Sequence, residues 1–472
     1  METNCTVVLD VGKTNSKLTL WTTTGVCLER RVRPNATVET GQYRTLDVAG
    51  IDAWLEDTVR DYAQRAVIST IIPVAHGAGA ALVRQGELFA PPMDYEQEIP
   101  ADIRAAYDKE RDAFADTGSP ALPQGLNLGA QLYYLEALTG PWPDDLQILP
   151  WPQYWAWRLS GVAASEVTSL GCHSDLWLPE AERPSQMSRR LGWAKRMGPL
   201  RHAGAPLGPI TAAWAERTGL PADCAVLCGL HDSNAALLAA RGHDEIAQHD
   251  ATILSTGTWF VAMRSPGPGP GAPALLRDLP EARDCLVNVD VNGGPVPSAR
   301  FMGGRESEVM AGIDIFHLTE NYDPEALIAR LPELIAADVM AFPTFVPGVG
   351  PFPSDKGRWI NEPESASDKR AVLGLYLALV ADVCLDLVGS CERLLVEGRF
   401  AEAEIFIHGL ATLRPDQKVY ISNAHDDVPY GALRLIQPHL KPASALTPVR
   451  PLDISLDGYR ARWRELMEGV SA

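Results

Sequence analysis

The chain has 472 residues, of which 46% are hydrophobic and 21% charged, and its formal net charge is −19. This length predicts two or three globular domains, each with its own core. The negative charge argues against nucleic-acid binding, although local Lys residues and backbone N–H groups still permit an anion site. Eight cysteines are too sparse for a disulfide scaffold. We find neither a signal segment nor an apolar membrane span, and therefore expect a cytoplasmic enzyme or binding protein.

The chain opens with the pattern of an antiparallel meander. Three successive strands are predicted, at Val7–Asp10, around Leu18 and Leu20, and at Val26–Val32. Another buried strand begins at Val67, and we expect Pro73, Gly77 and Gly79 to break the chain after it. Helices are predicted at Gly129–Gly140 and Pro152–Gly161.

The segment Cys224–Arg241 has the pattern of a strand, a tight turn and a helix, with Asp232 or Ser233 as candidate N-cap. A new unit then begins near residues 241–250. Its first strands are predicted at Thr252–Leu254 and Trp259–Met263, joined by a turn at Gly257-Thr258 and followed by a surface loop at Ser265–Pro273.

This strand–turn–strand resembles the opening of the chain, with Gly12 and Gly257 in corresponding turns. The pattern therefore suggests two similar domains. Further along, we predict a long buried helix in Asp368–Leu395, a strand in Ala403–Gly409 and a helix around Tyr430–Ile436.

The sequence from Gly12 begins Gly-Lys-Thr, which matches the end of a P-loop, but two requirements fail. A P-loop needs Gly five positions earlier, where Val7 stands, and a helix afterwards, where a β pattern follows. We predict instead a phosphate-binding hairpin, in which Gly12 admits a phosphate to the backbone and to residues Lys13–Asn15. Asp10 is placed to hold Mg²⁺ through water. The alternative is a plain hairpin with an exposed lysine.

Four motifs occur in order along the chain: LDVGKTNSK (Leu9–Lys17), CGLHDSNAALLA (Cys228–Ala239), LSTGTW (Leu254–Trp259) and IFIHGLATLR (Ile405–Arg414). Together they resemble the FGGY family of carbohydrate kinases, nearest to its L-fuculokinase and L-rhamnulokinase branch. The resemblance implies an α/β fold of two actin-like ATPase (ribonuclease H-like) domains with a substrate cleft between them. We expect the acceptor, the first phosphate motif and the catalytic Asp in residues 1–243, and the second phosphate motif and the adenine side in residues 244–472.

The resemblance also implies roles for individual residues. The reaction would be ATP- and Mg²⁺-dependent phosphorylation of a small sugar, with a ketose favoured by the branch. Asp232 matches the catalytic base, and Asp10 and Asp232 match the metal side. The implied nucleotide set is Gly12, Lys13, Thr14, Asn15, Lys17, Gly257, Thr258 and, beside adenine, Gly409. Because a carboxylate is a weak base at neutral pH, Asp232 would orient the hydroxyl and take its proton late. The alternative role for Asp232 is helix capping.

The sugar side has three candidates, His76, Glu96 and Asp232. The segment Ile72–Val83 resembles the family's sugar-contacting loop, which contains His76. In Pro91–Gln97, Tyr95-Glu96 stands where relatives often carry Arg-Asp, so the arginine is missing. The alternatives are a buried, satisfied His76 and an exposed Glu96.

The adenine motif departs from the family pattern. Relatives usually carry Gly-Gly and then Asn, whereas this chain has His408-Gly409 and Leu413. This leaves a second hypothesis open, a sugar-binding regulatory protein with an impaired nucleotide site, and a third, another actin-like ATPase. The expected partner is a small-molecule sugar, with neither nucleic acid nor membrane. The sequence identifies neither the sugar nor the oligomeric state, for which a homodimer is one alternative.

Overall fold

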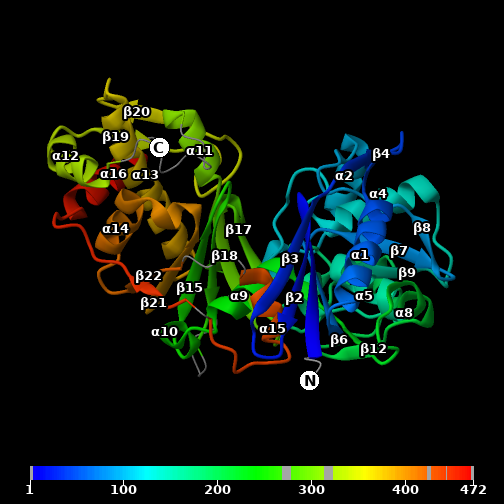
Figure 1. Cartoon of the computed structure of the whole chain (residues 1–472). Helices are drawn as coiled ribbons and strands as arrows, with labels where there is room; N and C mark the ends of the chain where they lie inside the picture. The colour runs from blue at the N-terminus through cyan, green and yellow to red at the C-terminus, as the bar shows by residue number, and fades with distance from the viewer. Residues whose placement is uncertain (1–3, 268–277, 313–322, 423–426, 443, 469–472) are drawn as a thin grey trace. The chain divides into compact units, whose positions relative to one another are not determined.

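The computed structural model describes residues 4–267, 278–312, 323–422, 427–442 and 444–468, which form two compact units (Figure 1). The first unit comprises the described residues of Met1–Gly242, Val287–Pro295 and Asp426–Pro442. The second comprises those of His243–Leu286, Val296–His425 and Ala443–Ala472. Two short segments from the second half of the sequence therefore belong to the first unit.

The first unit is built on a seven-stranded sheet. Strand β1 (Asn4–Val11) pairs antiparallel with β2 (Asn15–Thr22), and β2 pairs antiparallel with β3 (Cys27–Pro34), which confirms the predicted meander. On its other side β1 runs parallel to β6 (Val67–Ala75). The sheet continues with β13 (Ala225–Leu227) and β14 (Leu230–His231), both parallel to β6, and with β12 (Pro206–Pro209) at the edge.

Helices cover both faces of this sheet, which explains why β1 is buried along nearly all of its length. On one face lie α1 (Val48–Ala63), α5 (Trp151–Ser160) and α8 (Ala212–Thr218), whose apolar side chains share one core with alternate residues of β1. On the other face lie α9 (Asp232–Ala240) and α15 (Asp427–Leu433). These two helices pack closely, since a Cβ on Gly431 would lie 1.7 Å from Ala235 O.

Pro73 lies inside β6 and does not end it, so that prediction was wrong. Strand β13 pairs with Thr70 and Ile71, and β14 pairs with Val74 and Ala75. Pro73 therefore lies opposite the gap between these two short strands. No strand on that side needs a hydrogen bond from position 73, so proline, which has no N–H, is tolerated there. Gly229 joins β13 to β14 with φ +78°.

The remaining elements of the first unit surround this core. The helices are α2 (Ala101–Glu110), α3 (Phe114–Thr117), α4 (Leu128–Thr139), α6 (Val167–Leu170) and α7 (Gln186–Arg190). The small sheets are β4 (Thr37–Glu39) with β5 (Arg44–Leu46), β7 (Ala80–Arg84) with β8 (Glu87–Ala90) and β9 (Gln147–Pro150), and β10 (Trp177–Leu178) with β11 (Arg183–Pro184). The predicted helices at Gly129–Gly140 and Pro152–Gly161 are confirmed as α4 and α5.

The sheet of the second unit repeats the same topology. Strand β15 (Ala251–Thr256) pairs antiparallel with β16 (Phe260–Ser265), and β16 pairs antiparallel with β18 (Pro295–Phe301). On its other side β15 runs parallel to β21 (Arg393–Gly398), and β21 runs parallel to β22 (Lys418–Ile421). Strands β17 (Cys285–Val289) and β23 (Thr447–Pro448) complete it. Because β15 and β21 correspond to β1 and β6, the suggestion of two similar domains is confirmed.

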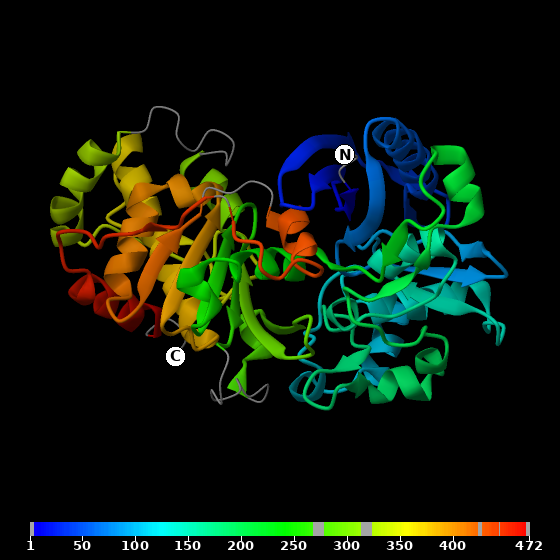
Figure 2. The ribbon, with the colours of Figure 1, turned by 60° about the horizontal axis from the view of Figure 1, so that its bottom comes forward.

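The helices of the second unit include the long buried α13 (Ala366–Leu387) and its neighbour α14 (Glu404–Leu413), the orange pair in Figures 1 and 2. The others are α10 (Asp244–Ala247), α11 (Gly303–Ala311), α12 (Pro324–Ala336) and α16 (Asp457–Glu468), with a small sheet of β19 (Met340–Phe342) and β20 (Arg358–Ile360). No described helix is long and apolar enough to cross a membrane.

Two predictions for this region were wrong. The segment Ala403–Gly409 belongs to helix α14 and its cap, not to a strand, and the strand of this region is β21. A short apolar run has no decisive period, and burial against α13 decides in favour of a helix here. The long helix also ends at Leu387, before β21 begins. The predicted loop at Ser265–Pro273 lies outside the described residues from position 268 onward.

Candidate active site

Three parallel strands of the first unit end at the same level. Val11 of β1 pairs with Ala75 of β6, and Ala75 pairs with His231 of β14. The residues that follow these strand ends are Gly12, His76 and Asp232, all predicted from the sequence. His76 N donates to Val11 O at 3.1 Å. The carboxyl edge of this sheet therefore brings together residues more than 200 positions apart in the sequence.

The turn after β1 is a hairpin, as predicted, because β2 follows it directly. Gly12 N donates to Asn15 O at 3.0 Å, and a Cβ on Gly12 would lie 3.0 Å from the same oxygen. Asn35 holds the turn from outside: its Nδ2 donates to Gly12 O at 2.8 Å and its backbone N donates to Thr14 O at 2.7 Å. Sequence reasoning missed Asn35, which belongs to no motif. Thr14 is exposed.

The Lys13 side chain is paired with acidic residues, so it is neither exposed to solvent without a partner nor free to bind a phosphate. Its ammonium forms an ion pair with the fully buried Asp94, lies 3.4 Å from Glu96 Oε2 and stands 5.0 Å from the centroid of the Tyr95 ring. Asp94 also accepts from Thr37 Oγ1 at 3.1 Å. Burial raises the pKa of Asp94, but the hydrogen bonds from Lys13, the Glu96 backbone N–H and Thr37, together with the Lys13 charge, outweigh this effect and hold the pKa below its usual value. The sequence did not indicate Asp94, because the motif in this segment aligns with the two residues that follow it, Tyr95 and Glu96.

Asp10 is buried and has a basic neighbour in Lys17, whose Nζ lies 3.4 Å from Asp10 Oδ2. Burial raises the pKa of Asp10 to about 6; Lys17 lowers it and the nearby Asp232 carboxylate raises it. Asp10 and Asp232 are therefore close enough to interact. A pair of carboxylates suits Mg²⁺, which keeps several waters and takes its other ligands from substrate phosphates. Among the described residues, no group of three or more His, Cys, Asp or Glu side chains forms a metal site of protein ligands alone.

Asp232 is the first residue of α9, and the N-cap position belongs to His231, so neither Asp232 nor Ser233 is the cap. Asp232 Oδ1 accepts from Ser233 N at 2.6 Å and from Ser233 Oγ at 3.2 Å, and it lies 3.2 Å from His231 Nε2. The Asp232 side chain remains 29% exposed. The carboxylate is thus oriented on one side and accessible, as a base requires.

Two buried histidines stand near this carboxylate. His231 Nε2 lies 3.4 Å from Cys172 Sγ, and burial lowers the pKa of His231. His76 Nδ1 lies 2.6 Å from Gly77 O, which can only accept, so Nδ1 carries the proton. Burial also lowers the pKa of His76, which favours the neutral imidazole. The ring of His76 packs edge-on against Tyr95, with 5.4 Å between centroids.

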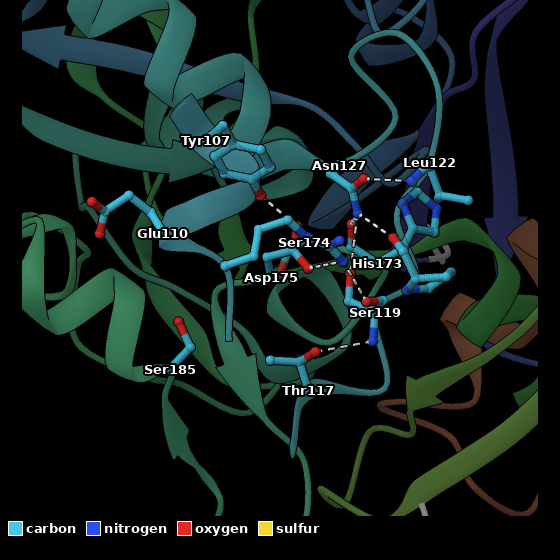
Figure 3. Close-up of polar contacts among 12 residues, drawn as sticks. Tyr107, Glu110, Thr117, Ser119, Leu122, Asn127, His173, Ser174, Asp175 and Ser185 are labelled. Carbon is cyan, nitrogen blue, oxygen red and sulfur yellow. Dashed lines mark hydrogen bonds and ion pairs between the residues drawn. The ribbon is translucent and has the colours of Figure 1, made fainter. Parts of the chain in front are cut away.

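A polar network of the first unit supports the segment that carries Cys172 (Figure 3). Asp175 accepts from Tyr107 Oη and, at 3.1 Å, from both Nε and Nη2 of Arg111. Asn127 Nδ2 donates to His173 O at 3.2 Å and to Ser119 Oγ at 3.2 Å. Because these bonds hold residues 173–175, they position the adjacent Cys172 beside His231. No sequence motif indicated this network.

The second unit has its own turn at the corresponding strand end. Gly257 N donates to Trp259 O at 3.0 Å, and Thr258 is exposed. Gly398 ends β21 opposite Thr256, with φ +89°, and a Cβ there would lie 2.1 Å from Thr256 O. Sequence reasoning missed Gly398, although a buried apolar strand that ends in Gly is a recognisable pattern.

Gly409 lies within α14 and not at a strand end. It is buried against α13, where a Cβ would meet Ala378 and Leu375 at 3.6 and 3.7 Å. His408 Nδ1 lies 2.6 Å from Arg450 O, and Leu413 is buried. Gly409 and Leu413 therefore contribute to packing, and His408 is held by its contact with the Arg450 carbonyl.

Comparison with known proteins agrees with these features. The model of the carbohydrate kinase FGGY C-terminal domain matches residues 248–444. A carbohydrate kinase from Novosphingobium aromaticivorans is 52% identical to this chain, with a TM-score of 0.95 and 100% of both chains covered. The L-fuculokinase of Escherichia coli (strain K12) is 26% identical over 278 residues, 56% of this chain and 57% of that protein. The L-fuculokinase of Salmonella typhi is 32% identical over 107 residues, 22% of each protein.

The chain thus matches less than two thirds of the length of either L-fuculokinase. A ligand-bound xylulose kinase from Lactobacillus acidophilus, 12% identical, has a TM-score of 0.76 over 99% of each chain, which shows a common fold. The α/β fold with two actin-like ATPase domains is therefore confirmed. On the full-length match and the order of its motifs, the chain belongs to the FGGY family of carbohydrate kinases.

Proposed function

We propose that this chain is a carbohydrate kinase that transfers the γ-phosphate of ATP, with Mg²⁺, to a hydroxyl of a small sugar, and that the sugar is a ketose. The observation that carries the proposal is the common level of the three strand ends in the first unit, which places Gly12, His76 and Asp232 at one edge of the sheet. Family membership supports the same reaction class. The two carboxylates that interact there, Asp10 and Asp232, add the chemistry that phosphoryl transfer requires.

In this proposal Asp232 orients the attacking hydroxyl and accepts its proton late in the reaction. The bonds from Ser233 hold Asp232 Oδ1 in place, and the partial exposure of the side chain leaves room for a hydroxyl. Asp10 and Asp232 would hold Mg²⁺ through water, and the ion would neutralise charge on the phosphates. His76 and Glu96 would contact the sugar.

The phosphate side of the proposal comprises Gly12, Thr14, Asn15 and Lys17 in the first unit and Gly257 and Thr258 in the second. Lys13 is left out because its ammonium pairs with Asp94 and Glu96. Two glycines are candidates for the position beside adenine: Gly398, at the end of β21, and Gly409, inside α14. The first unit would thus carry the acceptor and the base, and the second the adenine side.

Two further points support a cytoplasmic kinase over the alternatives. All eight cysteines are free thiols in the structure, as expected in a reducing compartment where ATP is available. The unusual residues His408 and Leu413 both have structural partners, since His408 Nδ1 lies 2.6 Å from Arg450 O and Leu413 is buried. These contacts account for both residues without an impaired nucleotide site.

A coupled ADP-release assay over a panel of ketoses and polyols, with and without Mg²⁺, tests the proposal. We expect ADP only when an acceptor and Mg²⁺ are both present. Sugar-induced thermal stabilisation without ADP release from any acceptor would indicate a regulatory sugar-binding protein instead. ADP release that is independent of every acceptor would indicate another kind of actin-like ATPase.

A further inference from the structure

We propose that Lys13 and Asp94 form an acceptor-binding pair that selects a neutral polyhydroxy compound, and that Lys13 is a specificity residue for the acceptor and not a ligand of the phosphates. This inference rests on the kinase function proposed above, whose acceptor class it narrows. Lys13 belongs to the hairpin proposed to bind the phosphates of ATP, but this inference assigns it to the sugar acceptor.

The contacts of Lys13 direct its ammonium away from the hairpin backbone. The ammonium pairs with Asp94, approaches Glu96 Oε2 to 3.4 Å and lies over the ring of Tyr95 at 5.0 Å. The Lys13 side chain is 18% exposed and that of Asp94 is 0% exposed, so the pair is largely shielded from water. Such a shielded ion pair has a defined geometry: the partly exposed Lys13 ammonium can offer a donor to a ligand, and the fully buried Asp94 fixes the position of that donor.

Asp94 is held rigidly, which a selective contact requires. Its Oδ2 accepts from Thr37 Oγ1 at 3.1 Å, and its Oδ1 accepts from the backbone N of Glu96 at 2.9 Å. Three donors from three different segments, including Lys13, therefore fix this carboxylate. Specificity residues of this kind depend on support from their neighbours.

The pair stands on the same side of the sheet as the proposed base. Tyr95, over which the Lys13 ammonium lies, packs edge-on against His76. Besides burial, the charges of both Asp232 and Lys13 act on the pKa of His76, in opposite directions. His76 is therefore within electrostatic reach of the base and of the ion pair. An acceptor whose hydroxyl meets Asp232 would extend toward Lys13 and Asp94.

A small cavity at this position has unused hydrogen-bonding capacity in its lining. Its walls include Gly12, Lys13, His76, Asp94 and Trp151. Trp151 is 1% exposed, and its Nε1 donor has no partner within the described part of the chain. Buried indole N–H groups are usually paired, so this donor calls for a hydroxyl or a water molecule. The lining thus offers donors and acceptors together, and the cavity has room for about one hydroxyl group of an acceptor or one water molecule.

The balance of charge selects against acidic acceptors. The Lys13 ammonium is already matched by Asp94 and Glu96, and the Lys17 ammonium is matched by Asp10. Beyond them, Arg44 lies 3.9 Å from Glu96 and 3.2 Å from Glu39. A sugar acid would therefore bring its carboxylate to Asp94, Glu96 and Asp232 without an unmatched cation among these groups. Like charges in such a site disfavour binding, so a neutral ketose or polyol fits better.

The test uses Lys13→Met, Asp94→Asn and the double variant, with Lys195→Met as a matched control on an exposed lysine. KM is measured separately for the acceptor and for ATP, and neutral ketoses and polyols are compared with aldonates. We expect Lys13→Met and Asp94→Asn each to raise the acceptor KM by about 10- to 100-fold, the loss of a charged hydrogen bond, with the KM for ATP nearly unchanged. The double variant should lose less than the product of the single effects, because it leaves no unpaired buried charge.

Each other outcome has a definite meaning. A raised KM for ATP with an unchanged acceptor KM would make Lys13 a phosphate ligand and overturn the inference. Unchanged values for both substrates would make the pair structural and overturn it as well. More efficient use of aldonates than of neutral sugars by the wild-type protein would also overturn it, while the kinase function would stand.

Binding measurements separate this inference from the proposed function. Neutral sugars and Mg-ATP are tested singly for thermal stabilisation of the wild-type protein and the variants. If the wild-type protein releases no ADP but Lys13→Met selectively abolishes stabilisation by neutral sugars, the kinase proposal fails and the acceptor pair stands. The double variant serves where Lys13→Met folds poorly, since it removes both charges together.

Discussion

Lys17 Nζ lies 3.4 Å from Asp10 Oδ2, across the antiparallel pair of β1 and β2 in which these two residues are direct partners. The hairpin register therefore places a lysine against the buried carboxylate that is proposed to face Mg²⁺. Because burial alone would keep Asp10 protonated to higher pH, Lys17 helps to maintain the ionised form at neutral pH.

The first prediction concerns Lys17→Met. Burial already raises the pKa of Asp10 to about 6, and loss of the ammonium should raise it further. The acid limb of the pH profile of kcat/KM should then move upward by about one pH unit, because more Asp10 is protonated at a given pH. Activity should fall more at pH 6 than at pH 8. Lys17→Arg retains the charge and should leave the limb in place; an unmoved limb in Lys17→Met would show that Asp10 does not control it.

The second prediction concerns Asp232→Asn. The amide retains the shape of the side chain but cannot accept the proton of the attacking hydroxyl. Turnover should fall by about 10²- to 10⁴-fold, while sugar and Mg-ATP still stabilise the protein against heat. Ser233→Ala is the control: it removes only the hydroxyl bond of 3.2 Å to Asp232 and keeps the backbone bond, so its effect should be below about 10-fold. Near-normal turnover in Asp232→Asn would reject the base.

The third prediction compares two glycines of the second unit. Gly398 has φ +89° and a Cβ there would lie 2.1 Å from Thr256 O, so Gly398→Ala should cost about 2 kcal/mol or more of the free energy of unfolding. Gly409 lies in a helix with ordinary contacts at 3.6 Å, so Gly409→Ala should be neutral or stabilise by up to about 1 kcal/mol.

Thermal unfolding measures the change in stability of both variants. The KM for ATP then shows whether either glycine also contacts the nucleotide. We expect Gly409→Ala to leave the KM for ATP unchanged, as packing on α13 implies. An increase without loss of stability would instead place Gly409 beside adenine, as the sequence motif suggested.

The fourth prediction concerns Glu166, a buried carboxyl group beneath the site. Glu166 Oε2 accepts from Thr168 Oγ1 at 2.6 Å, and the same hydroxyl oxygen accepts from His231 N at 3.0 Å. Burial raises the pKa of Glu166 from its ordinary 4.5 to about 7. Between these two values the unfolded chain has lost the proton that the folded protein still holds. The contribution of Glu166 to stability is therefore full below pH 4.5 and is lost as pH rises toward 7, by up to about 3 kcal/mol.

Glu166→Gln cannot titrate and should remove this part of the pH dependence. Relative to the wild-type protein, its urea midpoint should be higher at pH 8 than at pH 5. Glu216→Gln, on an exposed position of α8, is the control and should change neither midpoint appreciably. Equal effects of Glu166→Gln at both pH values would mean that Glu166 does not titrate in this range.

Local pattern was enough to predict the β1–β2–β3 meander, the repeat around Gly12 and Gly257, and the helices α4 and α5. In each case the period of apolar residues or the position of glycine reports directly on a short-range structure. Pattern was insufficient for Ala403–Gly409, where a short apolar run fits strand and helix equally. The packing of α14 on α13 favours the helix. It also buries Gly409 in a helix interface, which makes Gly398, at the end of β21, a second candidate for the position beside adenine.

The sequence by itself determined the family and the order of the strands around the two turns, because these depend on residue types at short and regular spacings. It also indicated Asp10 and Asp232 as the candidate acidic groups, and their roles in the reaction stay a prediction. Only the tertiary structure decided the partner of Lys13. Its ion pair with Asp94 joins positions 81 residues apart and depends on where the segment after β8 packs. The bonds of Asn35 to the hairpin and the level at which β1, β6 and β14 end were likewise decided by packing. The physical reason is that the direction of a lysine side chain on a hairpin depends on where its counter-charge is buried, and that position is set by long-range packing.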